Sequence, residues 1–149
     1  MSPKIFLPLL RELMASCQAF TAYSSTHIRT LDLTPPQFDI IATLGNTTGM
    51  SFKELGDNTL ITKGTLTGVV DRLTLKGLVQ RVAHAQDGRS QMVQLTEAGN
   101  ALFAQHFPAH LQHIAHALAP LSKKEMRALT DSLRTLRAAF ATASSEEKP

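Results

Sequence analysis

Apolar residues recur at helical spacing along most of the chain, and the pattern is clearest in residues 62–77. Leu66, Val69, Val70 and Leu73 follow one another at steps of three, one and three residues, which places them on one face of a helix. The opposite side carries short, small or charged residues, namely Lys63, Thr65, Thr67, Gly68, Asp71 and Arg72. A helix that is apolar behind and small and polar in front can be inserted into a groove of another molecule.

The residues before this segment predict two further helices. A long first helix ends near Thr30, and its apolar stripe consists of Phe6, Leu9, Leu10, Leu13, Cys17 and Phe20. The second helix begins after Thr34, because Thr34 and Gln37 have the spacing of a capping box and Pro35 suits the first helical position. This helix extends to about residue 44 and buries Phe38, Ile41 and Leu44.

Residues 51–77 predict two helices joined by a turn. Ser51 and Glu54 have the spacing of a second capping box, which opens the shorter helix. Thr62 is expected to cap the helix of residues 62–76, and Gly77 to end it, because glycine readily adopts the positive φ of a Schellman ending.

Two β-prone runs follow, with a turn between them at residues 86–90. Asp87 and Gly88 form a dipeptide that is typical of tight hairpin turns. Helix, turn, helix and a two-stranded hairpin together predict a winged helix-turn-helix. The expected fold class is therefore mostly α, with a small β-hairpin wing.

The last third of the chain predicts two more helices. Thr96 can cap a helix over residues 97–118, in which Pro108 is expected to cause a kink. Ser122 and Glu125 form a third capping box. The final helix carries a narrow apolar seam, which requires a helical partner and consists of Met126, Leu129, Leu133, Leu136 and Phe140.

Composition narrows the class of protein without identifying it. The chain has 149 residues, of which 43% are hydrophobic and 18% charged, as in an ordinary globular domain. There is no apolar run long enough to cross a membrane, so we expect a cytoplasmic protein. A single cysteine excludes an internal disulfide. The formal net charge of +3 is compatible with nucleic-acid binding but indicates little by itself.

In a winged helix-turn-helix, the second helix of the pair lies in the major groove of DNA. Helix N-termini and short hydroxyls bind phosphates, which makes Ser51, Thr62 and Thr65 candidate DNA contacts. Lys63 and Arg72 supply positive charge on the same helix. These residues predict a DNA-binding surface built around residues 62–77.

The hairpin tip supplies a second set of candidates. We expect Arg89 to enter the minor groove, where the negative potential favours arginine. Asp87 cannot attract DNA, and we expect it to orient Arg89 or Arg72 by a charge-assisted hydrogen bond. The simpler alternative for Arg89 is a solvated hairpin tip.

The segments LTPPQF, KEL, TLTGVVDRLTLKGLVQR, DGRS and VQLTEAG resemble the MarR (multiple antibiotic resistance regulator) family of bacterial transcription factors, over roughly residues 5–143. The resemblance implies a homodimer that binds double-stranded DNA at a pseudo-palindromic operator. It also implies release from DNA by a small aromatic anion, a metal or an oxidant. The expected parts are a dimerisation helix (1–33), a DNA-binding domain (34–96), C-terminal dimerisation helices (97–143) and a disordered tail (144–149).

The family places its DNA contacts on four residues of the recognition helix and one of the wing, namely Thr62, Lys63, Thr65, Thr67 and Arg89. This chain departs from the family pattern at two positions. Gly68 stands where many relatives carry a basic residue, and Ser90 where a second wing arginine is common. Both departures remove positive charge, so we expect a lower DNA affinity or a weaker salt dependence.

The histidines allow several interpretations. His106 and His110 lie one turn apart and could share a metal ion, with His27 and Asp39 as further ligands. We favour the simpler interpretation that these histidines are solvated or packed, and we expect no metal and no cofactor. A different possibility is that His27 or His110 lines an effector pocket and pairs with an anionic ligand when protonated.

Other functions fit the sequence less well than DNA binding. No nucleophile–base pair, phosphate loop or paired carboxylates stand out, so we do not expect an enzyme. A winged helix that binds only other proteins is an alternative, as is a metal- or oxidant-responsive regulator. Cys17 lies on the apolar stripe, which favours a small buried side chain over a peroxide-sensing thiol. Gly64 and Gly68 disfavour a plain core helix, because each costs about 1 kcal/mol relative to alanine.

Overall fold

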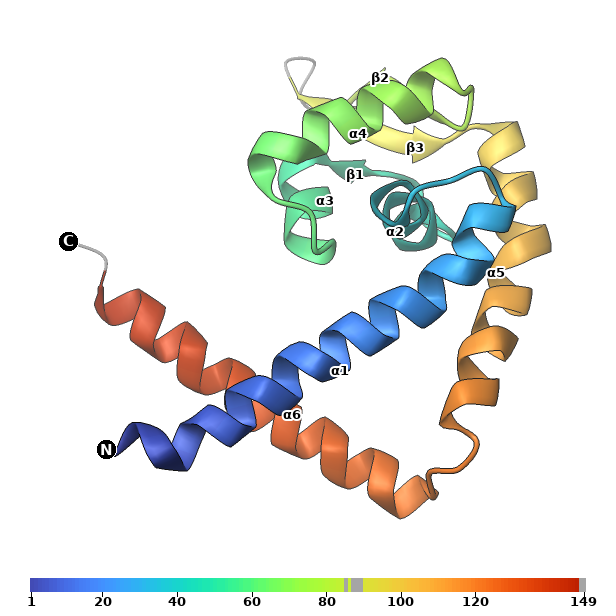
Figure 1. The fold of residues 1–149 in the computed structure, drawn as a ribbon. Coiled ribbons are helices and arrows are strands. Elements are labelled where there is room, and N and C mark those ends of the chain that lie inside the picture. Colours follow the sequence, from blue (N-terminus) through green and yellow to red (C-terminus); the bar gives the residue numbers. More distant parts are fainter. Residues whose placement is uncertain (85, 87–89, 148–149) are drawn as a thin grey trace. The chain divides into compact units, whose positions relative to one another are not determined.

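The structure, a computed structural model of the chain, describes residues 1–84, 86 and 90–147. Figure 1 shows its elements, which in chain order are α1 (Pro3–Thr30), α2 (Pro35–Leu44), β1 (Met50–Ser51), α3 (Phe52–Asn58), α4 (Lys63–Leu75), β2 (Val79–Ala83), β3 (Gln91–Leu95), α5 (Glu97–Leu118) and α6 (Lys123–Glu146). The chain divides into two units, Met1–His113 and Ile114–Pro149.

The hydrophobic core of the first unit lies between the helix-turn-helix and the small sheet. α4 buries the face that the spacing of its apolar residues predicts, since Leu66, Val69, Val70 and Leu73 are all buried. The largest side chains with almost no exposed surface come from α2, α3, α4, β2 and β3, and they are Ile40, Ile41, Leu44, Leu55, Val70, Leu73, Val79 and Val93. The winged helix-turn-helix is therefore held together by one continuous apolar core.

Among the described residues the sheet has three antiparallel strands in the order β1-β3-β2, whereas the sequence predicts only a two-stranded hairpin. β2 and β3 form that hairpin, with Val79 opposite Leu95. β1 adds Met50 opposite Val93 on the other side of β3. A strand of two residues shows no alternation of apolar and polar positions, so its existence depends on pairing with β3 and is not visible in the sequence.

The helix ends agree closely with the capping signals. Reciprocal capping boxes are present at Thr34 and at Ser122, each with the residue three positions later. At Gly77 the backbone has φ +75°, and its N–H donates to the carbonyl oxygen of Thr74. The N–H of the next residue donates to the carbonyl oxygen of Leu73, which completes the predicted Schellman motif.

One threonine joins the end of α4 to the start of α5. The hydroxyl of Thr96 donates to the carbonyl oxygen of Gly77 at 2.6 Å and accepts from the N–H of Gly99 at 3.1 Å. The N–H of Thr96 donates to the carbonyl oxygen of Leu78 at 3.1 Å. α5 therefore starts against the residues that follow α4, and it continues through Pro108 as a single helix.

The apolar stripes of α1 and α6 are exposed or only half-buried in the single chain. Only Ser24, Ser25 and Ile28 of α1 are buried, and they lie near its C-terminal end. Cys17 is exposed, so the expected burial of this side chain was wrong for a single chain, because none of the described residues covers that face. None of the described residues of α6 is buried, and the helix extends to Glu146, past the boundary expected at residue 143.

None of the helices in the described part of the chain combines the length and the hydrophobicity needed to span a lipid bilayer.

Candidate nucleic-acid interface

The outer face of α4, opposite its buried face, is the candidate DNA-binding surface. The predicted contact residues on this helix and at its start are all exposed, namely Thr62, Lys63, Thr65, Thr67 and Arg72. Between them, a Cβ atom added at Gly64 or at Gly68 would meet no atom within 4 Å. Packing within the chain therefore does not require these two glycines. A helix face without side chains at these two positions allows close approach by the backbone or a base of another molecule.

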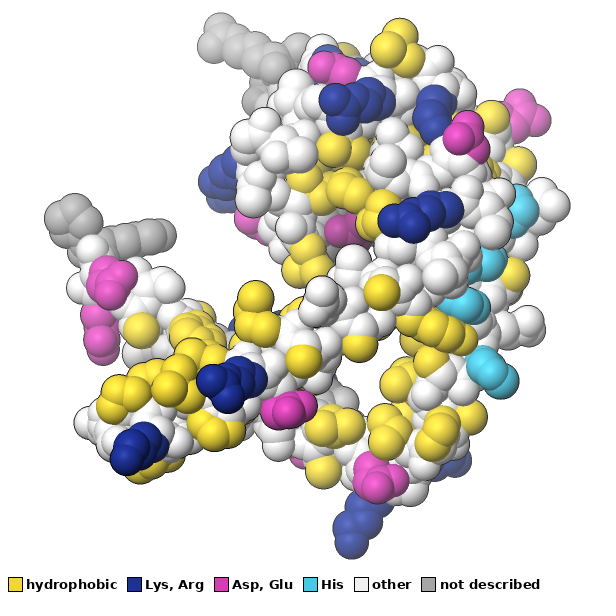
Figure 2. Space-filling model, viewed as in Figure 1, with side chains coloured by type: hydrophobic (Ala, Val, Ile, Leu, Met, Phe, Trp, Pro, Cys, Tyr) yellow, Lys and Arg dark blue, Asp and Glu magenta, His cyan; other side chains and the backbone are white. Residues whose placement is uncertain are grey.

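Charge is spread thinly over this part of the molecule. Figure 2 shows separate Lys and Arg side chains, coloured dark blue, with Asp and Glu side chains between them. This agrees with the net charge of only +3. Affinity for DNA must therefore depend on shape and hydrogen bonding as well as on counterion release.

Thr62 occupies the N-cap position of α4, but its side chain does not cap the helix. Its hydroxyl donates instead to the hydroxyl of Thr65, at 3.0 Å. The predicted role as a capping side chain was therefore wrong, because the two exposed hydroxyls pair with each other. With no side-chain cap, the first N–H groups of α4 are available to an external acceptor, as at helix N-termini that bind phosphate.

The turn that enters α4 is anchored at Thr59 and at the N–H of the outward-facing Leu60. Leu60 is 98% exposed, and its N–H donates to Asp39 Oδ2 of α2 at 3.1 Å. The buried hydroxyl of Thr59 donates to the carbonyl oxygen of Leu55 at 2.8 Å. Asp39, considered above as a metal ligand, thus has a structural contact, and Leu60 is an exposed residue beside the interface that the sequence did not single out.

Ser51 caps α3 as expected, since its Oγ accepts from the N–H of Glu54 at 3.1 Å. The reciprocal hydrogen bond of the predicted capping box, from the N–H of Ser51 to the side chain of Glu54, is not found among the described residues. The half-buried serine ends β1 and starts α3, so its hydroxyl hydrogen remains available at the N-terminus of that helix.

The tip of the wing, including Asp87 and Arg89, lies outside the described residues, so their roles stay predictions. At the base of the wing, Arg81 of β2 forms an ion pair with Asp71 of α4. The guanidinium carbon of Arg81 also lies 5.2 Å from the ring centroid of Phe52 in α3. Arg81 thus connects the first strand of the wing to both helices of the helix-turn-helix. The sequence did not predict this ion pair, because Arg81 and Asp71 lie ten positions apart in different elements.

The structure brings together the two histidines of the predicted effector pocket. His27 Nδ1 of α1 lies 3.0 Å from His110 Nδ1 of α5. Burial lowers the pKa of both side chains, and neighbouring histidines lower it further. In the described part of the chain, no three His, Cys, Asp or Glu side chains are grouped so that they could hold a metal ion, which leaves His106 and His110 without a third ligand.

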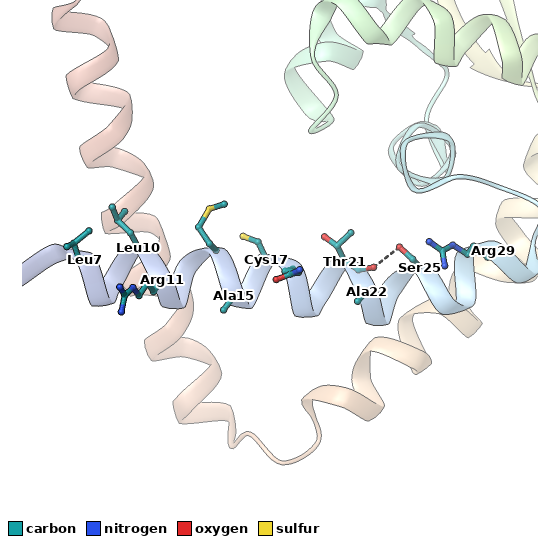
Figure 3. Close-up of a pocket in the computed structure, with 11 residues that line it drawn as sticks. Leu7, Leu10, Arg11, Ala15, Cys17, Thr21, Ala22, Ser25 and Arg29 are labelled. Carbon is teal, nitrogen blue, oxygen red and sulfur yellow. Dashed lines mark hydrogen bonds between the residues drawn. The ribbon is translucent and has the colours of Figure 1, made fainter.

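A hollow also runs along α1, and its lining residues all belong to that helix. Figure 3 shows Leu7, Leu10, Cys17, Thr21 and Arg29 among the side chains that line it. A helix face that is exposed and largely apolar normally lies against another surface in the functional protein.

Comparison with known proteins agrees with this geometry. A sequence profile of the MarR family matches residues 31–90. The HTH-type transcriptional regulator MhqR of Bacillus subtilis is 30% identical over 133 residues, which cover 89% of each chain. A mutant of Escherichia coli MarR, solved in complex with operator DNA, is 26% identical with a TM-score of 0.78, over 88% of this chain and 94% of that chain. BpsR of Bordetella bronchiseptica, whose DNA binding is regulated by 6-hydroxynicotinic acid, is 26% identical with a TM-score of 0.76, over 85% and 91%.

The fold and the exposed recognition helix define a winged helix-turn-helix DNA-binding protein. The chain belongs to the MarR family of transcriptional regulators, whose members are not enzymes. The family and the fold class predicted from the sequence are confirmed.

Proposed function

We propose that this protein is a transcriptional repressor that binds a pseudo-palindromic operator as a homodimer and is released by a small effector. The observation that carries the proposal is the outer face of α4. Its hydroxyls and cations are exposed. No neighbouring atom within 4 Å would exclude a larger side chain at its two glycines. Such a face is explained by an external partner with a deep, polar groove, which in this family is DNA.

We assign the contacts by their chemistry. Phosphates are bound by the N-terminal N–H groups of α4, by Lys63 and by the hydroxyl of Ser51. Thr65 and Thr67 face base edges in the major groove, and Arg72 contacts the flanking backbone. In the wing, which carries Asp87 as the orienting carboxylate, Arg89 enters the minor groove.

We propose that a second copy of the chain packs against the exposed apolar faces of the long helices. The side chains of Met14 and Phe20 on α1 are 70% and 59% exposed, and those of Leu133 and Phe140 on α6 are each 54% exposed. Burial of such side chains contributes roughly 25 cal/mol per Å² of apolar surface. This supports the division into dimerisation helices (1–33 and 97–143) around a DNA-binding domain (34–96).

The proposed effector is a small aromatic anion. BpsR, which is similar over most of its length, responds to such a molecule. His27 is half-buried beside His110, and either ring could pair with a carboxylate when it is protonated. We place the effector pocket at these two histidines.

The proposal is tested by a gel shift with the DNA upstream of the protein's own gene, together with footprinting and light scattering. We expect a dimer that protects two half-sites whose centres are about one helical turn, near 10 bp, apart. A panel of phenolic acids should relieve the shift. A folded dimer that binds no DNA even at low salt would instead favour the protein-interaction alternative.

Gly68→Arg is expected to strengthen DNA binding. A Cβ atom at this position meets nothing within 4 Å, so the longer side chain has room to reach a phosphate. Each dimer gains two cations, and the slope of log K against log salt should become steeper by about 2. The matched control is Gln105→Arg, which adds the same charge at an exposed position of α5. Equal gains in both variants would show that the effect is not local to α4.

A further inference from the structure

Three histidines form a cluster between α1 and α5 that is outside the DNA-binding surface. This histidine cluster consists of His27 on α1 and of His110 and His113 on α5, all within the first unit. His110 is buried, with 7% of its surface exposed, and the other two are half-buried. Imidazole is the side chain whose charge ordinarily changes between pH 5 and 8, so a contact between two such rings in a partly buried site can respond to proton concentration.

The contact between His27 and His110 requires one shared proton. Their Nδ1 atoms are 3.0 Å apart, so one ring must donate and the other accept. His110 Nε2 lies 3.4 Å from Ser24 Oγ, a hydroxyl that can rotate to donate or to accept. The pair therefore keeps its contact when it carries no charge or one positive charge. With two charges, an N–H of each ring would face the other at 3.0 Å, and the contact must break.

In the part of the chain that the structure describes, no opposite charge acts on the pair to stabilise it when it is doubly charged. His113 and His106 are the ionisable neighbours that lower the pKa of His27, while His27 and His113 lower that of His110. From α1, Tyr23 stacks on His113 with ring centroids 4.1 Å apart. On α2, the carboxylate of Asp39 accepts from the N–H of Leu60. Among the described residues, the ionisable side chains that act on the pair are therefore other histidines, which can add only positive charge.

A contact with α2 connects the cluster to the DNA-binding elements. The ring centroid of Phe38 lies 4.6 Å from that of His110. Phe38 belongs to the hydrophobic core, and α2 packs directly on α4. Movement of the His110 ring therefore disturbs the base on which the recognition helix sits.

We propose that the histidine cluster is a proton-operated switch, in which uptake of a second proton by the His27–His110 pair separates α1 from α5 and weakens DNA binding. The effect of this switch on DNA binding rests on the proposed function. The proton uptake itself rests only on the geometry of the pair and can be measured without DNA.

The sign of the stability change follows from the direction of the pKa shifts. Burial and the neighbouring histidines hold the pKa of His27 and of His110 below the ordinary value of 6.5. The unfolded chain therefore binds protons more readily than the folded chain once the pH falls below 6.5. Stability is fully present above that pH and decreases as the pH is lowered through it towards the folded-state values.

The test compares the wild-type chain with His27→Gln between pH 7.5 and pH 5.5, in buffers with a metal chelator. Glutamine keeps a hydrogen-bonding group at this position but cannot take up a proton. We expect the wild-type DNA affinity to fall at least tenfold more across this range than that of the variant, whatever their affinities at pH 7.5. Imidazole NMR spectra should show His27 and His110 titrating together. His116→Gln, at an exposed position of α5, should behave as the wild type.

Equal pH dependence in the wild type and His27→Gln would overturn the switch. So would a pH dependence that appears only without chelator, because that would assign the contact to a bound metal. A chain that binds no DNA at any pH but shows the coupled titration, with a matching loss of melting temperature, would contradict the DNA readout and the proposed function. It would leave the proton uptake by the pair supported.

Discussion

Removal of the Lys63 and Thr65 side chains together is expected to weaken operator binding about a hundredfold at physiological salt. Each subunit loses one phosphate-binding cation and one hydroxyl, and an exposed contact of either kind contributes roughly 0.5–1 kcal/mol. A loss of about 1.4 kcal/mol in each subunit of a dimer corresponds to a factor of about 100. The change in folding stability should be small, because both side chains are exposed.

Fluorescence anisotropy with labelled operator measures this effect, and the single variants separate its two parts. Lys63→Ala should make the slope of log K against log salt shallower by about 2 per dimer, whereas Thr65→Ala should leave that slope unchanged. The matched control is Lys124→Ala with Thr130→Ala on α6, where both residues are exposed. The hydroxyl of Thr130 bonds only to the carbonyl oxygen of Met126 in its own helix among the described residues. A loss below threefold in the Lys63/Thr65 variant would refute the docking of α4.

Gly99→Ala is expected to cause a large loss of folding stability. A Cβ atom at residue 99 would lie 2.0 Å from the carbonyl oxygen of Leu78, which is backbone and cannot rotate away. Relief of this overlap must move α5 away from the end of α4, and it strains the hydrogen bonds of Thr96 at that junction. Overpacking of this kind costs about 3 kcal/mol. Urea unfolding followed by circular dichroism measures the change.

Gly68→Ala is the matched control for Gly99→Ala. It makes the same substitution in a helix, but where the added Cβ meets nothing within 4 Å. The variant should be more stable than the wild type by about 0.5–1 kcal/mol, because alanine is the better helix former. If both variants lost similar stability, the overlap with Leu78 would not be the cause.

The parts of the fold that could be predicted from the sequence are those determined by neighbouring residues. The Schellman ending at Gly77 and the capping box at Thr34 depend on hydrogen bonds between residues three to five positions apart. The buried face of α4 follows from helical periodicity alone. Such features are local, so the sequence carries their full signal.

The features that could not be predicted depend on which elements meet in three dimensions. β1 has only two residues and exists because β3 lies beside it. The ion pair of Arg81 with Asp71 and the hydrogen bond of Leu60 to Asp39 join separate elements. The exposure of Cys17 could not be predicted either. An apolar stripe indicates that a helix face packs against something, but not whether the packing partner belongs to the same chain.

The two faces of α4 have different roles, and this affects how proteins of this kind can diverge in sequence. Its inner face contributes Val70 and Leu73 to the core, whereas an added atom at Gly64 or Gly68 on its outer face touches nothing in the chain. Substitutions on the outer face can therefore accumulate after gene duplication without loss of folding. Duplicated copies can acquire new target sites through these positions while the same scaffold is inherited unchanged.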